Sequence, residues 1–199
     1  MKSLRVFGLT GGIATGKSTA VSFFKELDPD VVVFDADACV KQLYQSDSVL
    51  NEIENHFGKE ALIDGELNRD FLRTKLFHCE KSKKFLESLL HPRVRKECLA
   101  LLEKAKQSSS ATLFLADVPL LFEKSFGFGQ ELNLVVAVST STQILRLKKR
   151  NGFDDATVHA ILEAQLPMDQ KIDLADIVFW NDGQPEVLKM QIQRFLNDL

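Results

Sequence analysis

The sequence is poor in several features that would place the chain in a specialised class of proteins. Its 199 residues include only three cysteines, Cys39, Cys79 and Cys98, which are odd in number, widely spaced and outside any C-x-x-C pair. A disulfide framework and a structural zinc site both need paired or closely spaced cysteines, so the sequence predicts neither and favours a reducing compartment.

Long apolar runs are missing as well. No apolar stretch reaches the length that spans a membrane, and the run within the first twelve residues, MKSLRVFGLTGG, is too short for a signal peptide. We therefore expect a cytoplasmic protein that has no membrane partner.

An excess of positive charge is also absent. The chain carries 25 Lys and Arg against 28 Asp and Glu, a net charge of −3, and it contains no basic block. Nucleic acids and anionic membranes select basic surfaces, so we expect neither as a partner, and any cationic site must be local. With 45% hydrophobic residues, the chain can form one core with room for a lid or an inserted subdomain. The oligomeric state stays open.

Short apolar segments alternate with helical patterns along the chain. The predicted strands are rich in Val, Leu, Ile and Phe throughout, which is typical of strands covered on both faces; they span 4–10, 31–34, 112–118, 132–139 and 177–180. The predicted helices span 18–27, 36–45, 49–57, 68–77, 81–90, 92–107, 142–150, 154–166 and 185–199. This alternation predicts an α/β, doubly wound fold with a mainly parallel five-stranded sheet and helices on both faces. The long connection from 35 to 111 predicts a helical subdomain over the carboxyl ends of the strands.

The most informative motif is GGIATGKS, from Gly11 to Ser18, which fits the phosphate-binding pattern G-x-x-x-x-G-K-[ST]. It follows a predicted strand and opens a predicted helix, which is the context that such a loop needs. Glycines let successive N–H groups point at an anion, and the helix N-terminus adds to the attraction. Lys17 would bridge the β- and γ-phosphates, and the Ser18 hydroxyl would bind Mg²⁺. The alternative is a glycine-rich turn with an exposed lysine. It requires a strand, two glycines, Lys, Ser and a helix to occur in this order by chance.

Two carboxylates follow the second predicted strand, at Asp35 and Asp37. They would lie at the same edge of the sheet as the phosphate loop, where a carboxylate can accept a proton from a hydroxyl or hold Mg²⁺. Asp35 is nearest the strand end and is the favoured base. Helix capping is the alternative for both residues, and Asp37 also suits a first helical turn.

The segment LFLAD, ending at Asp117, has the form of a Walker B strand that supports Mg²⁺, although many buried strands end in Asp for turn reasons. The residues that follow, Pro119 to Glu123, are an apolar patch with one carboxylate. They would line an acceptor pocket or belong to the core.

Basic residues occur in two places. His91, Arg93 and Arg95 lie at a predicted break between two helices, where Pro92 suits the first helical position. Arg93 and Arg95 diverge on a helix, so one of them is expected to face the site, and an exposed solvated face is the alternative.

The second basic group lies near the end of the helix predicted at 142–150. Arg146 and Arg150 share one helix face, which suits two guanidinium groups that reach one polyphosphate. The alternative is that the helix dipole favours basic residues near a helix C-terminus even where no ligand binds. Lys171, further along the chain, would belong with these arginines to a mobile segment that covers the site.

Taken together, these residues resemble the dephospho-CoA kinase family. The resemblance covers nearly the whole chain, in GLTGGIATGKST at 8–19, DAD at 35–37, LLHPRVR at 89–95, DVPLLFE at 117–123, Q-x-x-R-x-x-x-R at 143–150, AQLPMDQKIDLAD at 164–176 and WNDG at 180–183. It implies a P-loop nucleoside-kinase fold and transfer of the ATP γ-phosphate to the ribose 3′-hydroxyl of dephospho-CoA, with Mg²⁺. It also implies a nucleotide-binding core (1–35 with 111–140 and 175–199), an acceptor-binding helical subdomain (36–110) and a lid (141–174).

The resemblance implies a role for each matching residue. Lys17, Asp35, Arg146 and Arg150 would be catalytic, with the two arginines as lid-side phosphate clamps, while Ser18 and Asp117 would serve the metal. The nucleotide would contact Gly11, Gly12, Ile13, Ala14, Thr15, Gly16, Lys17, Ser18, Thr19 and Asn181. The acceptor would contact Asp37, His91, Arg95, Leu120, Leu121, Phe122 and Glu123.

The loop departs from the family pattern at Ala14, where glycine is usual, and a methyl group is tolerated there if φ is negative. Thr15 replaces the commoner serine. Two rivals remain: another small-molecule P-loop kinase, acting on a nucleoside monophosphate or gluconate, and a GTP-binding switch. The switch would need an N-K-x-D-like element after a late strand, where this chain has WNDG.

Overall fold

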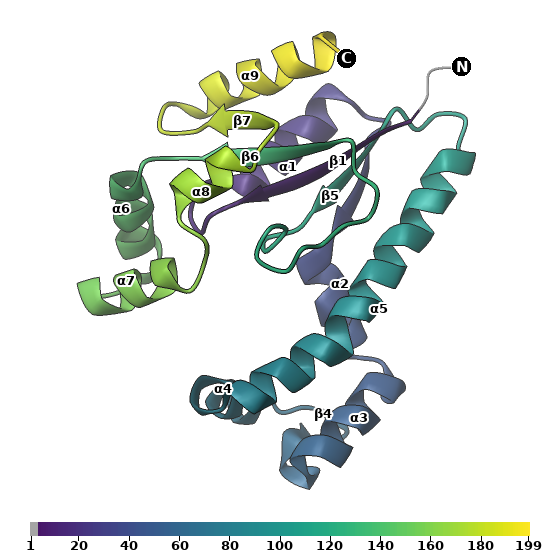
Figure 1. Ribbon diagram of the computed structural model, residues 1–199, viewed down its shortest axis with the longest axis vertical. Coiled ribbons are helices and arrows are strands. Elements are labelled where there is room, and N and C mark those ends of the chain that lie inside the picture. The colour runs from purple at the N-terminus through teal and green to yellow at the C-terminus, as the bar shows by residue number, and fades with distance from the viewer. Residues whose placement is uncertain (1–3) are drawn as a thin grey trace. The chain divides into compact units, whose positions relative to one another are not determined.

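A computed structural model of the protein describes residues 4–199. Residues 1–3, which belong to the predicted nucleotide-binding core, lie outside the described residues. The strands are β1 (Arg5–Gly11), β2 (Val32–Asp35), β3 (Leu62–Ile63), β4 (Glu66–Leu67), β5 (Leu113–Asp117), β6 (Leu132–Ala137) and β7 (Ile177–Trp180) (Figure 1). The helices are α1 (Lys17–Leu27), α2 (Ala36–Leu43), α3 (Asp47–Phe57), η1 (Lys59–Ala61), α4 (Arg69–His78), α5 (Glu80–Gln107), α6 (Thr140–Asn151), α7 (Asp155–Glu163), α8 (Met168–Asp173) and α9 (Pro185–Asn197).

The main sheet has five strands in the order β2-β5-β1-β6-β7, and every neighbouring pair is parallel. All carboxyl ends therefore lie at one edge, where open parallel sheets bind their ligands. The register pairs Asp35 at the end of β2 with Asp117 at the end of β5. The predicted α/β fold and five-stranded sheet are confirmed, because continuous apolar runs are the signature of strands that are buried on both faces.

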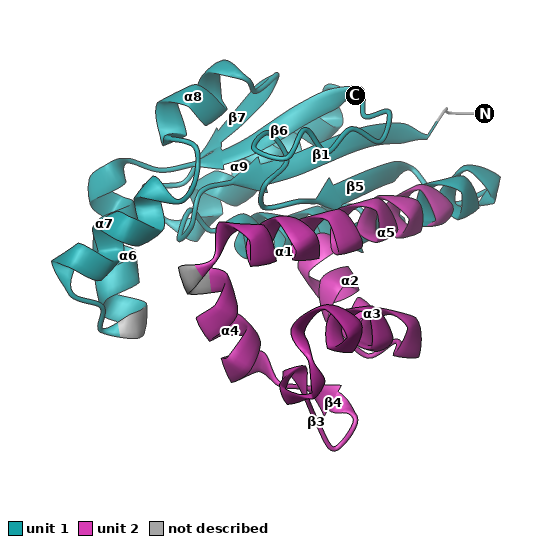
Figure 2. Cartoon of the chain, turned by 60° about the horizontal axis from the view of Figure 1, so that its bottom comes forward, with its two compact units in different colours: residues 1–35, 101–199 teal, residues 36–100 magenta. Residues whose placement is uncertain are grey.

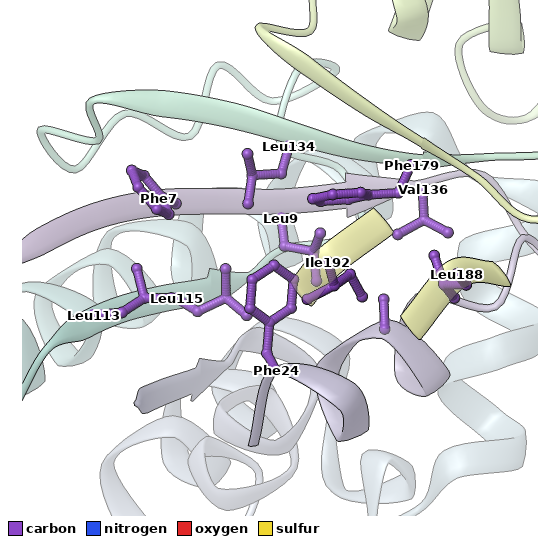
Figure 3. Close-up of a cluster of buried hydrophobic side chains, with 11 residues drawn as sticks. Phe7, Leu9, Phe24, Leu113, Leu115, Leu134, Val136, Phe179, Leu188 and Ile192 are labelled. Atoms are coloured by element: carbon purple, nitrogen blue, oxygen red, sulfur yellow. The ribbon is translucent and has the colours of Figure 1, made fainter. Parts of the chain in front are cut away.

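One layer of the core lies between this sheet and the helices α1 and α9 (Figure 3). Its strand residues include Phe7, Leu9, Leu115 and Leu134, and Phe24 of α1 is fully buried among them. Phe24 also makes an edge-to-face contact with Phe179, with ring centroids 5.9 Å apart. This packing fixes α1 beneath β1 and so fixes the loop that joins them.

The chain divides into two compact units (Figure 2). Unit 1 comprises the residues up to Asp35 together with Leu101–Leu199, and unit 2 comprises Ala36–Ala100, so the boundary falls within α5. Unit 2 has its own apolar core, built from Val49, Ile53, Ala61, Leu72, Leu86, Leu89 and Leu90. The functional division into core, acceptor-binding subdomain and lid stays a prediction.

The expected helix break at His91 and Pro92 is wrong, because α5 continues through Pro92 from Glu80 to Gln107. Proline removes one helical N–H, the donor to the carbonyl four residues earlier, and Pro92 is exposed. The sequence also gave no sign of α8, of η1, or of the short antiparallel pair β3–β4. These are elements of two to six residues, too short for a periodic pattern.

Within residues 4–199 no helix combines the length and the apolar character that crossing a bilayer requires. Cys39, Cys79 and Cys98 form no disulfide bonds. Burial, with a smaller effect from the neighbouring Cys39, raises the pKa of the Cys98 thiol to about 12, so this thiol stays protonated and unreactive at neutral pH.

Candidate active site

The loop between β1 and α1 has the backbone of an anion site. Gly16 adopts φ +91°, and α1 begins at Lys17 with no side-chain cap and no acidic residue in its first turn. The first N–H groups of this helix are therefore left for a ligand, which the helix dipole requires to be negative. Ala14 has φ +60°, so the condition of a negative φ under which its methyl group is unstrained is not met.

The outer side of the loop is held by side chains from far along the sequence. The carbonyl of Ile13 accepts from Gln143 Nε2 at 2.8 Å, and that of Ala14 from Arg146 Nη1 at 3.2 Å. The carbonyl of Thr15 accepts from Asn181 Nδ2 at 2.8 Å. Three consecutive carbonyls of the loop are thus bound by side chains, which fixes the orientation of the peptide groups between them.

At Gly12 and Gly16 the side chains that bind the loop leave no room for a Cβ atom. A Cβ atom on Gly12 would lie 2.6 Å from Gln143 Nε2 and 2.7 Å from Met168 Cε. A Cβ atom on Gly16 would collide with Asn181 Nδ2, at a φ that side chains disfavour in any case. The glycines of the motif therefore serve the contacts behind the loop as well as the ligand in front of it.

Lys17, Asp117 and Asp35 meet at the carboxyl edge of the sheet. Lys17 Nζ forms an ion pair with Asp117 Oδ1, whose residue is buried, and Asp35 is the register partner of Asp117 on the neighbouring strand. Asp35 and Ser18 are exposed. The three residues predicted to act on phosphate, metal and acceptor hydroxyl therefore belong to two adjacent strands and to the first turn of α1.

The donor set fits Mg²⁺ and does not fit a metal caged by protein ligands. In the described part of the chain no group of three or more His, Cys, Asp or Glu side chains could hold a metal ion. Mg²⁺ takes one or two carboxylates and completes its octahedron with water and substrate phosphates. Asp117 and the Ser18 hydroxyl, the predicted metal ligands, are of the kind that would provide such partial coordination beside a phosphate loop.

The segment after β5 is tied to the lid residues predicted at 141–174. Glu123 Oε1 lies 2.6 Å from Nζ of Lys171, which is fully buried, and accepts from Leu166 N at 3.1 Å. The carbonyl of Pro119 accepts from Thr10 Oγ1 at 3.0 Å and from Lys171 Nζ at 3.5 Å. Glu123 Oε2 is buried without a hydrogen-bond partner. Burial of this pair makes the contact strong once formed and costly to break.

The other predicted acceptor residues after β5 differ in exposure. Leu121 is 2% exposed, and its Cδ2 atom lies 3.0 Å from the position that a Cβ atom on Gly8 would take, so it packs against β1. Leu120 and Phe122 are half-buried.

Asn181 and Asp182 follow β7, and Asn181 bonds to the phosphate loop while Asp182 accepts from Ser139 at the start of α6. Asn181 is buried, and its carbonyl accepts from Arg146 Nη2 at 2.7 Å. Desolvation raises the pKa of Asp182, but hydrogen bonds from Thr142 and Ser139 outweigh it, and the pKa lies below its ordinary range. Arg146 and Asn181, predicted to contact nucleotide, thus also hold the loop from behind, while Arg150 is exposed on α6.

In unit 2, the predicted acceptor contacts lie on two helices. Asp37 is exposed in the first turn of α2, and Arg95 is exposed on α5. His91 is half-buried on the same helix. Arg93 is engaged with Leu89 and Glu52, which leaves Arg95 as the more accessible of the two arginines that the sequence could not separate.

Gln143 and Gln165 were not predicted as site residues. Gln165 Oε1 accepts from Ile13 N at 3.0 Å, so both glutamines hold the same loop residue. The signal that could have found them is their place in two of the family motifs, Q-x-x-R-x-x-x-R at 143–150 and AQLPMDQKIDLAD at 164–176. A neutral glutamine on a helix points to no chemistry by itself, and only the tertiary fold shows that Gln143 is buried. Both also line a pocket of about 650 Å³ beside Gly12, together with Leu162, Leu166 and Met168.

Comparisons with known proteins show similarity over nearly the whole chain. The dephospho-CoA kinase family model matches residues 5–186. A dephospho-CoA kinase of Bacillus thuringiensis subsp. konkukian is 38% identical over 193 residues, covering 96% of this chain and 95% of that protein. Another, from Aggregatibacter actinomycetemcomitans, is 42% identical over 179 residues, covering 89% and 84%.

Among solved structures, that of TT1252 from Thermus thermophilus superimposes with a TM-score of 0.82 at 30% identity, covering 100% of this chain and 99% of that one. The similarity therefore extends over the sheet, the loop and the helices alike.

Proposed function

Because the chain belongs to the dephospho-CoA kinase family, we propose that the carboxyl edge of its five-stranded sheet is the centre of phosphoryl transfer. The chain is a P-loop kinase of the final step of CoA biosynthesis, which phosphorylates the ribose 3′-hydroxyl of dephospho-CoA at the expense of ATP. The proposal concerns which residues carry out that reaction. A cytoplasmic location stays a prediction.

We assign the ATP phosphates to the N–H groups of the loop and of the first turn of α1. Lys17, now paired with Asp117, would exchange this partner for the β- and γ-phosphate oxygens, where it neutralises charge that shifts during transfer. Arg146 and Arg150 would add positive charge from α6. The uncapped helix start at Gly16 supports this placement.

The Ser18 hydroxyl and Asp117 would hold Mg²⁺. When bound, the ion neutralises negative charge on the transferring phosphates. Release of Asp117 from Lys17 would leave this carboxylate available, so the ion pair holds a buried charge until nucleotide and metal arrive.

Asp35 would accept the proton of the ribose 3′-hydroxyl. The hydroxyl oxygen then forms a bond to the γ-phosphorus as the bond between this phosphorus and the β–γ bridging oxygen breaks. The electrons of the broken bond remain with ADP, and the proton remains on Asp35 until solvent removes it. Asp37, His91, Arg95 and the Leu120–Glu123 segment would position the acceptor.

The observation that carries these assignments is the register of Asp35 with Asp117, beside the ion pair of Lys17. A coupled ADP-release assay with dephospho-CoA, adenosine, AMP and gluconate tests the function. We expect kcat/KM for dephospho-CoA to exceed that for adenosine by at least ~10²-fold, equivalent to about 2.7 kcal/mol of transition-state binding. Equal use of the two acceptors would contradict the substrate, and preference for AMP or gluconate would favour a rival kinase.

Arg95→Ala tests the acceptor side separately. The substitution should lower kcat/KM for dephospho-CoA more than for adenosine, because binding energy from remote parts of a substrate aligns the reacting hydroxyl. An unchanged ratio would remove Arg95 from acceptor recognition and leave the reaction itself in place.

A further inference from the structure

Two amide side chains form hydrogen bonds with the backbone of one residue of the phosphate loop, Ile13. Gln143 Nε2 donates to the carbonyl of Ile13 at 2.8 Å, and Gln165 Oε1 accepts from the N–H of Ile13 at 3.0 Å. One residue thus has both of its backbone polar groups bound by side chains more than 120 positions away in the sequence.

The two glutamines come from different elements. Gln143 is buried in α6, with 5% of its surface exposed. Gln165 belongs to the link between α7 and α8, and the peptide next to it is fixed, because Leu166 N donates to Glu123 Oε1 at 3.1 Å. Glu123 is itself paired with the fully buried Lys171 of α8. The position of Gln165 is therefore set by a buried ion pair.

Ile13 precedes the loop residue whose backbone is strained. The next residue, Ala14, has φ +60°, a conformation that costs an alanine roughly 1–2 kcal/mol. Fixing the N–H and the carbonyl of Ile13 fixes the peptide planes on both sides of that residue. A loop held this way loses less conformational freedom when a ligand binds, and pre-organisation of this kind increases affinity.

We propose that Gln165, acting together with Gln143, is a positioning residue that holds the phosphate loop in its nucleotide-binding conformation. The assignment rests on the proposed function in that the loop is taken to be the ATP site. It gives the link between α7 and α8 a direct part in nucleotide affinity, through one hydrogen bond to the loop backbone.

Substitution of Gln165 tests the assignment. Gln165→Met removes the acceptor at nearly constant volume, and Gln165→Asn keeps the amide but shortens it by one methylene. Both should weaken binding of ADP with Mg²⁺, measured by titration calorimetry, by about 3- to 10-fold, the range expected for one net hydrogen bond. KM for ATP should rise by the same factor, with KM for dephospho-CoA changed less than twofold. Gln170→Met, on the exposed side of α8, is the matched control and should bind ADP as the wild type does.

A double-mutant cycle separates positioning from a general structural effect. Because both glutamines hold Ile13, the loss of ADP affinity in Gln143→Met/Gln165→Met should be smaller than the product of the two single losses. Wild-type ADP affinity in both folded Gln165 variants would overturn the proposal, as would losses that multiply. A wild-type enzyme that binds ADP but leaves dephospho-CoA unphosphorylated would instead overturn the proposed function alone.

Discussion

The two units of the chain are stabilised by different kinds of core. Among the described residues, unit 1 buries the polar or charged side chains of Thr10, Thr15, Asp117, Gln143, Lys171 and Asn181, whereas unit 2 buries that of Ser82. The core cluster of unit 2 consists of aliphatic side chains, with partly buried aromatic ones packed against it. A buried polar group is costly unless it is hydrogen-bonded, so its position is dictated by its partner.

This difference indicates where the chemistry is fixed. In unit 1 the buried polar groups bond to the phosphate loop or to the segment after β5, which restricts the positions of backbone atoms there. Apolar packing in unit 2 fixes the positions of the helices, but it is not directional and does not orient polar groups. We expect substitutions in the polar network to alter nucleotide chemistry, and substitutions in the apolar core of unit 2 to alter stability alone.

The largest effect is expected for Lys17→Ala. Loss of the positive charge at the transferring phosphates should reduce turnover by about 10³–10⁵-fold. The melting temperature should also fall, because the substitution leaves Asp117 buried without its cation. Turnover and thermal melts compared with Lys25→Ala, on the exposed end of the same helix, measure both effects. A rate near that of the wild type would remove the loop from the mechanism.

Asp35→Asn should lower kcat by about 10²–10⁴-fold with little change in ATP affinity, because an amide cannot accept the proton. Its register partner gives the comparison: Asp117→Asn should raise the Mg²⁺ concentration needed for half-maximal rate. Titrations of Mg²⁺ on both variants distinguish the roles. If Asp117→Asn is inactive at every Mg²⁺ concentration while Asp35→Asn only shifts the titration, the two assignments must be exchanged.

Lys171→Met should destabilise unit 1 by about 3–5 kcal/mol, the usual cost of removing one partner of a buried ion pair. Chemical denaturation measures this cost. The double variant Lys171→Met/Glu123→Gln should recover part of it, since no buried charge remains unpaired. A double variant less stable than Lys171→Met would show that the pair is not the source of the loss.

Ile53→Ala, in the core of unit 2, should cost about 2–5 kcal/mol of stability through the cavity it leaves. Binding of ADP, measured well below the melting temperature, should stay at the wild-type value. Weaker ADP binding by the folded variant would contradict the separation between the two units.

The smallest effect is expected for Ala14→Gly. Glycine relieves the positive φ of residue 14 but adds freedom to the unfolded chain, so a net gain of up to about 1 kcal/mol is expected. The denaturant midpoints of the wild type and of Ala14→Gly show whether the substitution raises or lowers the stability. A loss of stability would show that contacts of the methyl group outweigh the backbone strain.

Much of unit 1 could be predicted from local patterns. Continuous apolar runs identified the strands, the glycine spacing identified the loop, and the carboxylates at strand ends indicated where Asp35 and Asp117 lie. The prediction failed at Pro92, because the helical context around a single proline outweighed its local preference. It also failed at α8, which is one turn and a half long and depends on Lys171 for its place.

The sequence by itself determined the parallel sheet, the phosphate loop and the kinase class, since each follows from residue types at fixed short spacings. Only the tertiary structure decided that Gln143, Gln165, Arg146 and Asn181 converge on the backbone of that loop. The physical reason is that a hydrogen bond between residues more than 100 positions apart has no local spacing. Its partners are set by the packing of the strands and helices that carry them.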